Sequence, residues 1–242
     1  MKFFTLIILS FFDYFHKKKI LNFLKEKKLK TLNCLFDVGA HHGESVKFFT
    51  NFLKVKNIYC FEPSPDNFKI LKKNISKYTK ENSVKIIIEN IALGALNTKK
   101  IFSQFSETSS STLKEINYLS KYYQKKNFFL DTSSSKSVNV IQKKLKDYIL
   151  INKICDFDLI KIDTEGNEYE VLLGLEDYLS YFKIVIFEHH YDDMIIKGYT
   201  FSDINNLLKK YNFSKVFKSK MPFRKTFEYI YINDKYINDK YI

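Results

Sequence analysis

Acidic side chains and histidines stand at the ends of several short apolar segments of this chain. They are Asp37, Glu62, Asp163 and the run Glu188-His189-His190. Carboxylates bind hydroxyl and ammonium groups, and histidine is the side chain whose unperturbed pKa suits proton transfer near neutral pH. If the apolar segments are neighbouring parallel strands, the pattern predicts one crevice that binds a polar ligand and moves a proton.

A glycine turn follows the first of these segments. Leu35 to Val38 is expected to form a buried strand, and the apolar residues after Gly43 recur at helical spacing. In such a strand–turn–helix unit the backbone can approach a ligand closely, and free N–H groups at the helix start favour polar or anionic groups. The candidate cofactor contacts in this turn are Asp37, Gly39, His41 and Gly43.

The glycine spacing distinguishes two kinds of cofactor. Dinucleotide-binding turns follow G-x-G-x-x-G, whereas this turn follows G-x-x-x-G and has His41 where a middle glycine would let a pyrophosphate approach the backbone. Asp37, two residues before Gly39, favours a ligand with a positive group. S-adenosylmethionine, with its amino group and sulfonium, therefore fits better than NAD. The competing interpretation is an acid that simply ends a strand.

The second strand end supports a nucleotide-like ligand. Glu62 lies 19 residues after Gly43, which is the spacing at which an acid binds ribose hydroxyls in nucleotide-binding units. Pro63 and Ser64 form the turn beside it and are taken as further cofactor contacts. A surface glutamate next to a proline turn is the alternative.

Later segments are expected to complete the pocket. A third strand at 84–89 leads into Asn90 and Ile91, which are candidates for the adenine pocket, although a plain strand-to-turn transition explains them nearly as well. The hydroxyl-rich segment 106–113 is either a flexible loop or a lid over the cofactor. The polar segment 114–136 is interpreted as an insertion that borders the acceptor.

Two further strand ends supply candidates for proton transfer. Asp163 ends the expected fourth central strand and His189 follows the fifth. Neighbouring strands lie about 4.8 Å apart, so both side chains could reach one acceptor group. Asp163 and His189 are the candidate bases with His190 in reserve, and Asp163 is also a candidate cofactor contact. Asp163, Glu188 and His189 are metal-ligand types, but nothing in their spacing requires a metal, so no metal site is predicted.

The composition limits the partners and the compartment. The net charge is +13, yet Arg224 is the only arginine and tryptophan is absent. This lysine-rich bias is typical of an A/T-rich genome, and nucleic-acid readers use arginine for bidentate contacts, so nucleic acid is not the expected partner. Three cysteines without a C-x-x-C motif are expected to be buried reduced thiols in a cytoplasmic protein.

The N-terminus allows two interpretations. Residues 1–15 are strongly apolar and Lys17-Lys18-Lys19 follow, but the run is too short to span a membrane and Asp13 interrupts it. It is either a helix packed on the domain or an interfacial membrane anchor, which would make the protein a peripheral membrane protein through residues 1–30. The expected organisation is an N-terminal helical extension at 1–30, a catalytic domain at 31–235 and a short tail at 236–242.

Six segments, in this order and at these intervals, resemble the FkbM family of S-adenosylmethionine-dependent methyltransferases. They are DVGAHHG, CFEPSP, ENIALG, SSSTL, LIKIDTEGNEYEVLLG and IVIFEHH. The resemblance covers roughly residues 34–232 and implies an α/β fold, the Rossmann-like class I methyltransferase fold. Its doubly wound sheet would have seven strands in the order 3-2-1-4-5-7-6, with strand 7 antiparallel. His41 replaces the asparagine more usual in the family, and the N-terminal apolar run lies outside the resemblance.

The resemblance implies O-methylation of a hydroxyl on a sugar, glycan, glycolipid or natural product, with S-adenosylmethionine as methyl donor. Two other classes stay open. A nucleic-acid methyltransferase is suggested by the positive charge, but the chain has no N-P-P-Y-type motif. A non-catalytic cofactor-binding protein of the same fold is the other, and the acids at each expected strand end argue against it.

Overall fold

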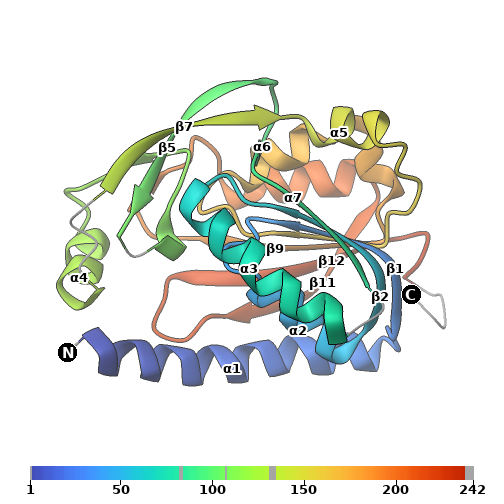
Figure 1. Cartoon of the computed structure of the whole chain (residues 1–242), viewed down its shortest axis with the longest axis horizontal. Coiled ribbons are helices and arrows are strands. Elements are labelled where there is room, and N and C mark those ends of the chain that lie inside the picture. The colour runs from blue at the N-terminus through green and yellow to red at the C-terminus, as the bar shows by residue number, and fades with distance from the viewer. Residues whose placement is uncertain (1, 82–83, 107, 131–134, 238–242) are drawn as a thin grey trace.

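The computed structural model describes residues 2–81, 84–106, 108–130 and 135–237. Its centre is a seven-stranded sheet in the order β11-β12-β9-β8-β1-β2-β3 (Figure 1). The strands are β1 (Thr31–Val38), β2 (Lys54–Phe61), β3 (Lys85–Glu89), β8 (Leu159–Ile162), β9 (Ile184–His190), β11 (Phe213–Lys220) and β12 (Thr226–Asn233). When these seven strands are numbered 1 to 7 along the chain, their order in the sheet, read from β3 to β11, is 3-2-1-4-5-7-6.

Strand direction agrees with the expected fold. β3, β2, β1, β8 and β9 pair in parallel, and β12 is antiparallel to both β9 and β11. The carboxyl ends of five parallel strands therefore meet at one edge of the sheet, where ligands bind in doubly wound folds. The predicted fold class and strand order are confirmed.

Helices cover both faces of this sheet because its strands are apolar on both sides. One face packs against α1 (Lys2–Glu26), α2 (Glu44–Phe52) and α3 (Pro65–Glu81), through buried residues such as Leu24, Phe49 and Leu71. The other packs against α5 (Leu145–Ile151), α6 (Glu168–Leu173) and α7 (Phe201–Lys210). Successive residues of a strand point to opposite faces, so Leu35 belongs to the first core and Phe36 to the second.

Smaller elements lie over the carboxyl edge of the sheet. β4 (Ala92–Leu93), β5 (Thr98–Phe105) and β7 (Ser135–Lys143) form a three-stranded sheet, and β6 (Glu115–Ile116) pairs with β10 (Ile195–Ile196). Helix α4 (Lys121–Leu130) and two short 3-10 helices (Thr108–Ser110 and Glu176–Tyr181) complete the described elements. Most of the segment interpreted as an insertion is therefore ordered, and residues 131–134 lie outside the described residues.

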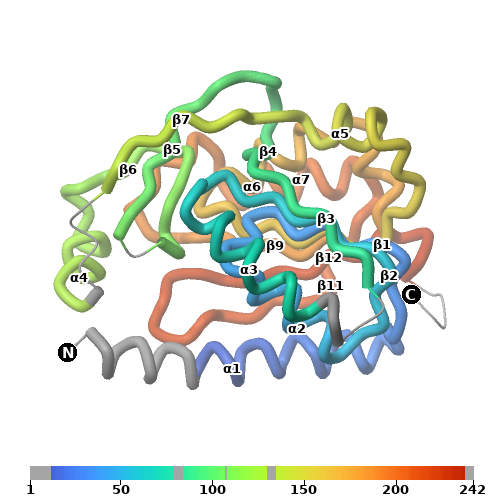
Figure 2. Tube along the Cα trace, in the orientation of Figure 1, coloured from blue at the N-terminus to red at the C-terminus, as the bar shows by residue number. Residues whose placement is uncertain are grey.

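Helix α1 runs along the molecule beneath the β11–β12 hairpin (Figure 2). Its second half packs on the domain, with Ile20 and Leu24 buried in the core and Phe23 against Phe217 of β11 at 4.9 Å between ring centroids. The packing interpretation thus holds for this half, whereas the side chains of residues 1–11 lie outside the described residues. No helix in the described part of the chain is long and apolar enough to cross a membrane.

The cysteines differ from one another. Cys34 and Cys60 are buried on β1 and β2, but Cys155 is exposed. The expectation of three buried thiols is therefore wrong for Cys155, because it lies in the connection before β8 and not within the strand.

Candidate active site

A cavity of about 330 Å³ lies at the carboxyl edge of the central sheet. The ends of β1, β2, β8 and β9 line it together with the 90–93 turn, α1, α4 and the β11–β12 hairpin. Among the sequence-predicted site residues, those that line it are Gly39, His41, Glu62, Pro63, Ile91, Asp163 and His190. Asp37, Gly43, Ser64, Asn90 and His189 are not among the lining residues.

The glycine turn has a left-handed backbone at alternate residues, with φ of +83° at Gly39, +47° at His41 and +92° at Gly43. A Cβ atom on Gly39 would lie 1.8 Å from the backbone oxygen of Asp163. Gly39 is therefore required for the close approach of the β1 and β8 ends, as well as for its left-handed conformation. This reason differs from the expected one, which was the approach of a ligand to the turn.

Glu62 is fixed by the turn that it faces. Its carboxylate accepts hydrogen bonds from the backbone N–H of His41 at 2.8 Å and of Ser64 at 2.9 Å. Burial raises the pKa of Glu62, and these two N–H groups oppose the rise. A carboxylate oxygen offers more than one lone pair, so Glu62 can also accept hydrogen bonds from hydroxyls in the cavity.

The hydroxyl-rich segment contacts the turn. Thr108 lies 2.8 Å from His41 Nε2, and Thr108, Ser109 and Ser111 line the cavity. The His41 and His42 rings stack at 3.7 Å, and His41 Nδ1 lies 3.1 Å from Glu44. Burial disfavours the His41 cation, but the hydrogen bond to Glu44 and the charges of Glu44, Glu62 and Asp163 together outweigh burial and raise the pKa of His41. The lid interpretation therefore fits this segment better than a free loop.

Two adenine-pocket candidates separate in the structure. Ile91 lines the cavity. The amide of Asn90 instead donates hydrogen bonds to the backbone carbonyls of Glu62 at 2.7 Å and Pro63 at 3.1 Å. Asn90 thus holds the Glu62 turn in place from outside the cavity.

Asp37 and Asp163 belong to a row of ionisable side chains on the α1 face of the sheet. Asp163 lies 2.9 Å from Lys161 Nζ and lines the cavity. Asp37 is fully buried, with both carboxylate oxygens unbonded among the described residues, and burial raises its pKa to about 6 against the opposing charge of Lys161. The expected direct contact of Asp37 with a cofactor is not supported, because Asp37 lies one residue too deep in β1 to line the cavity.

The two histidines of β9 point to opposite faces of the sheet. His189 packs against Tyr191, Tyr199 and Phe201, with ring centroids 4.8, 5.9 and 5.7 Å away. The expectation that His189 and Asp163 meet is therefore wrong. Asp163, Glu188 and His189, which were considered as metal-ligand types, do not come together either. The physical reason is strand alternation, which places His190 and not His189 on the face shared with Glu188.

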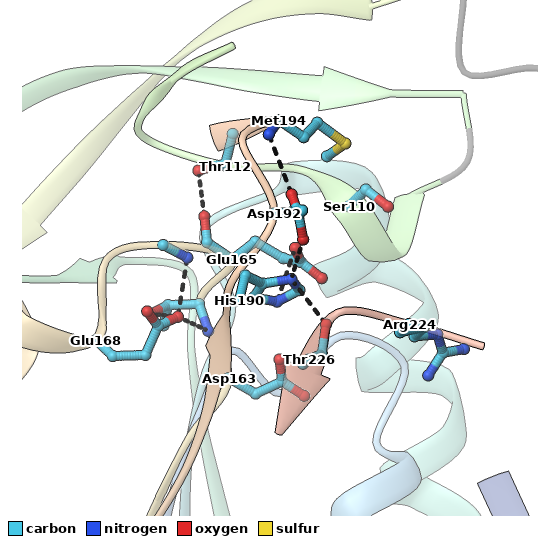
Figure 3. A network of polar contacts seen from close by, with 12 residues as sticks. Ser110, Thr112, Asp163, Glu165, Glu168, His190, Asp192, Met194, Arg224 and Thr226 are labelled. Carbon is cyan, nitrogen blue, oxygen red and sulfur yellow. Dashed lines mark hydrogen bonds and ion pairs between the residues drawn. The ribbon is translucent and has the colours of Figure 1, made fainter. Parts of the chain in front are cut away.

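His190 lies at the centre of a buried polar network (Figure 3). Its Nδ1 is 3.1 Å from Thr226 Oγ1 and 3.5 Å from Asp192 Oδ2, whereas its Nε2 is 3.3 Å from Glu165 Oε2. Burial disfavours the charged imidazole, but the Glu165 charge and the Asp192 bond outweigh burial and raise the pKa of His190 to about 9. This arrangement can take up a proton and stabilise the resulting imidazolium.

Several residues of the network were not singled out as site residues from the sequence. Asp192 is held in place by the Met194 N–H at 3.1 Å, and Thr226 starts β12 opposite His190. The sequence did not show which residues of β9 face the cavity. Every second residue of the strand shares one face, and this face carries Ile184, Ile186, Glu188 and His190. Glu165 follows the same strand end as Asp163, so the sequence places it at the crevice, but it does not show its contact with His190.

The residues present fit S-adenosylmethionine. Glu62 is a preorganised acceptor for ribose hydroxyls, Ile91 offers an apolar surface for an adenine ring, and the nearby Asp163 carboxylate suits a positively charged group. The cavity therefore has a cofactor end at β1–β2 and a second end towards α1 and the β11–β12 hairpin.

Comparisons with known proteins agree with this geometry. A model of the FkbM methyltransferase domain matches residues 37–215. A methyltransferase FkbM from Methylobacillus flagellatus KT is 15% identical with a TM-score of 0.54, over 84% of this chain and 44% of that protein. This chain thus spans less than half the length of the Methylobacillus protein.

A second fold likeness is to magnesium protoporphyrin IX methyltransferase from Synechocystis PCC 6803. Its structure with bound SAM is 10% identical with a TM-score of 0.51, over 90% of this chain and 78% of that one. No match was found among curated protein sequences. Because the domain match covers most of the chain, the chain belongs to the FkbM methyltransferase family.

Proposed function

We propose that this enzyme methylates a hydroxyl of an uncharged, hydroxyl-rich acceptor: a sugar, a glycan, a glycolipid or a similar natural product. The observation that carries the proposal is His190, buried at the cavity between two carboxylates. A hydroxyl is a poor nucleophile while it keeps its proton, so a general base is useful for this acceptor class. When bound, S-adenosylmethionine supplies a methyl group that is already activated.

His190 acts as the base through Nε2. Its Nδ1 faces Thr226 Oγ1 and Asp192 Oδ2, and in this proposal the neutral ring carries its proton at Nδ1, which leaves Nε2 as the acceptor. A proton taken from the acceptor hydroxyl is then held at Nε2, and Glu165 and Asp192 stabilise the imidazolium that forms. The high pKa makes neutral His190 a strong base, at the cost of a small neutral fraction at pH 7.

Asp163 has a different role in this proposal. Burial opposes its ionisation, but the Lys161 charge and hydrogen bond lower the pKa of Asp163. A carboxylate held ionised in this way is a weak base. It is better suited to orient the acceptor and to offset positive charge at the cofactor end.

The charges of the cavity separate this function from nucleic-acid methylation. Seven carboxylates line the cavity against four lysine and arginine side chains. The carboxylates are Asp13, Glu44, Glu62, Asp163, Glu165, Glu188 and Glu228, and the cations are Lys17, Lys126, Lys161 and Arg224. Even with the His190 imidazolium counted as a fifth cation, carboxylates outnumber cations, which disfavours a phosphodiester strand although the chain as a whole has a net charge of +13.

Our proposal places the enzyme in the cytoplasm, at a membrane surface. Tyr14, Phe15 and Phe223 are 56%, 46% and 72% exposed, and Phe223 packs against Phe12 of α1. Exposed aromatic side chains next to Lys17-Lys18-Lys19 suit an anionic lipid surface. Replacing Tyr14, Phe15 and Phe223 by serine should abolish sedimentation with vesicles of 30% phosphatidylglycerol in phosphatidylcholine; equal sedimentation of both proteins would remove this part of the proposal.

The acceptor proposal is tested with methyl-tritiated S-adenosylmethionine. The enzyme is incubated with separate glycan, glycolipid, RNA and protein fractions of a cell extract. An O-methyl ether survives both nuclease and mild alkali, so label with these properties in a glycan or glycolipid fraction is expected. Label released by nuclease would show a nucleic-acid acceptor, and label released by mild alkali would show a carboxyl acceptor; either would overturn the proposal.

A further inference from the structure

Helix α1 lies outside the segment matched by the FkbM domain, which begins at residue 37, yet it forms one wall of the cavity. The lining residues of α1 are Asp13, His16, Lys17 and Ile20. These positions follow the spacing i, i+3, i+4 and i+7, which places them on one face of a helix. The exposed Lys18 and Lys19 lie off this face.

The opposite wall is formed by the β11–β12 hairpin and the end of β9. Arg224, in the turn between β11 and β12, lies 3.0 Å from Asp13 through both Nη1–Oδ1 and Nη2–Oδ2. Deeper in the same gap, His16 lies 2.9 Å from Glu228 and 3.2 Å from Ser219. An ion pair and a buried hydrogen-bonded histidine therefore join α1 to the hairpin across the second end of the cavity.

These two contacts differ in accessibility. His16 is 3% exposed and Glu228 is 5% exposed, so this pair is suited to fixing the helix. The Asp13 and Arg224 side chains are 30% and 28% exposed and line the cavity, so a ligand can reach them. Glu188 also lines this end and accepts no hydrogen bond from any residue in the described part of the chain.

We propose that α1 completes the acceptor site, and that Asp13, Arg224 and Glu188 form a subsite for the part of the acceptor beyond the methylated hydroxyl. This inference rests on the proposed O-methylation. Glu188 and Asp13 accept hydrogen bonds and the Arg224 fork donates them, which is the set needed for neighbouring hydroxyls of one ring. Because Asp13 neutralises Arg224, the subsite selects uncharged rings over phosphorylated or carboxylated ones.

Asp13 and Arg224 are specificity-determining residues in this account, and the buried His16 is a positioning residue. A purely structural role would attach α1 to the hairpin without affecting ligand binding. The two roles are separated by the conservative variant Asp13→Asn, which keeps the side-chain shape and one acceptor oxygen. Glu26→Gln is the matched control, an acid-to-amide change on the same helix at an exposed position away from the cavity.

The test is saturation-transfer NMR on the full chain with S-adenosylhomocysteine present, so that the cofactor end is filled. The small molecules tested are the methyl glycosides of glucose, galactose, mannose and rhamnose, with glucose 6-phosphate as a charged comparison. We expect transfer to at least one methyl glycoside and none to the phosphate. Transfer should fall at least about fivefold in Asp13→Asn and stay unchanged in Glu26→Gln, with S-adenosylhomocysteine affinity and thermal unfolding midpoint unchanged in both.

Equal transfer in wild type and Asp13→Asn would overturn the α1 subsite while leaving O-methylation intact. Stronger transfer to glucose 6-phosphate than to the glycosides would overturn the preference for uncharged rings. Absence of transfer from every glycoside to the wild-type protein would overturn the inference altogether. In that case the labelling experiment, which does not use these compounds, decides separately whether hydroxyl methylation stands.

Discussion

The two ends of the cavity are built in different ways. At the cofactor end, the turn after β1 and the turn after β2 meet through contacts between residues close in sequence, such as His41 and Glu62, 21 positions apart. At the acceptor end, Asp13 of α1 meets Arg224 of the hairpin across 211 positions. The first end can therefore be deduced from local spacing, whereas the second exists only once the fold has formed.

The largest expected effect is the loss of the base at the acceptor end. We expect His190→Gln to lower kcat about 10²–10⁴-fold, the usual contribution of general base catalysis, while S-adenosylmethionine affinity stays within about twofold. His189→Gln is the matched control, since this neighbouring histidine faces the aromatic core behind the sheet. Rates of methyl transfer for both variants check this, and a larger loss in His189→Gln would exchange the roles of the two histidines.

The second prediction concerns the strand ends that carry both halves of the site. Gly39→Ala places a Cβ atom 1.8 Å from the Asp163 carbonyl in a left-handed backbone, so we expect it to lower the unfolding free energy by more than about 3 kcal/mol. Gly198 also has a positive φ, but a Cβ atom added there would have no atom within 4 Å. Gly198→Ala should therefore lower the unfolding free energy by only about 1 kcal/mol. Urea unfolding measures both, and equal losses would show that the approach of β8 to Gly39 is not tight.

The third prediction concerns the cofactor end alone. Glu62→Gln removes the charge that accepts hydrogen bonds from the turn and from a ribose, and should weaken S-adenosylmethionine binding by about 1–3 kcal/mol. Glu89→Gln is the control, since Glu89 ends the adjacent strand without lining the cavity and instead bonds Tyr148 at 3.0 Å. Calorimetry that finds equal affinity for Glu62→Gln and wild type would remove Glu62 from the cofactor site.

The comparison of the two ends also shows what the sequence could predict. Apolar periodicity and glycine positions predicted the strands of the central sheet, and the distance from Gly43 to Glu62 predicted Glu62 as a ribose contact. In the structure Glu62 accepts a hydrogen bond from the glycine turn at His41, and its contact with ribose stays a prediction. These features depend on neighbours within one βα unit, so the local chain specifies them.

The choice between His189 and His190 required the phase of β9. In a strand buried on both faces the sequence is apolar at every position, and no alternation shows which residues face the cavity. Phe187 and His189 share the α7 side, and Glu188 and His190 share the α1 side. The α1 wall was unpredictable for another reason: an apolar segment that precedes the domain does not indicate which surface it will cover.

The central claim is that His190, with its raised pKa, removes the proton from the acceptor, and the pH dependence of kcat/KM tests it most directly. Because kcat/KM reports ionisations of the free enzyme, and the carboxylates around His190, Glu165 and Asp192 first, outweigh burial and raise its pKa to about 9, the active neutral fraction rises with pH. We predict a rise of about tenfold per pH unit from pH 7, levelling off near pH 9, and no such rise in the residual activity of His190→Gln. A wild-type profile that is flat between pH 7 and 9.5, or the same rise in His190→Gln, would contradict the account.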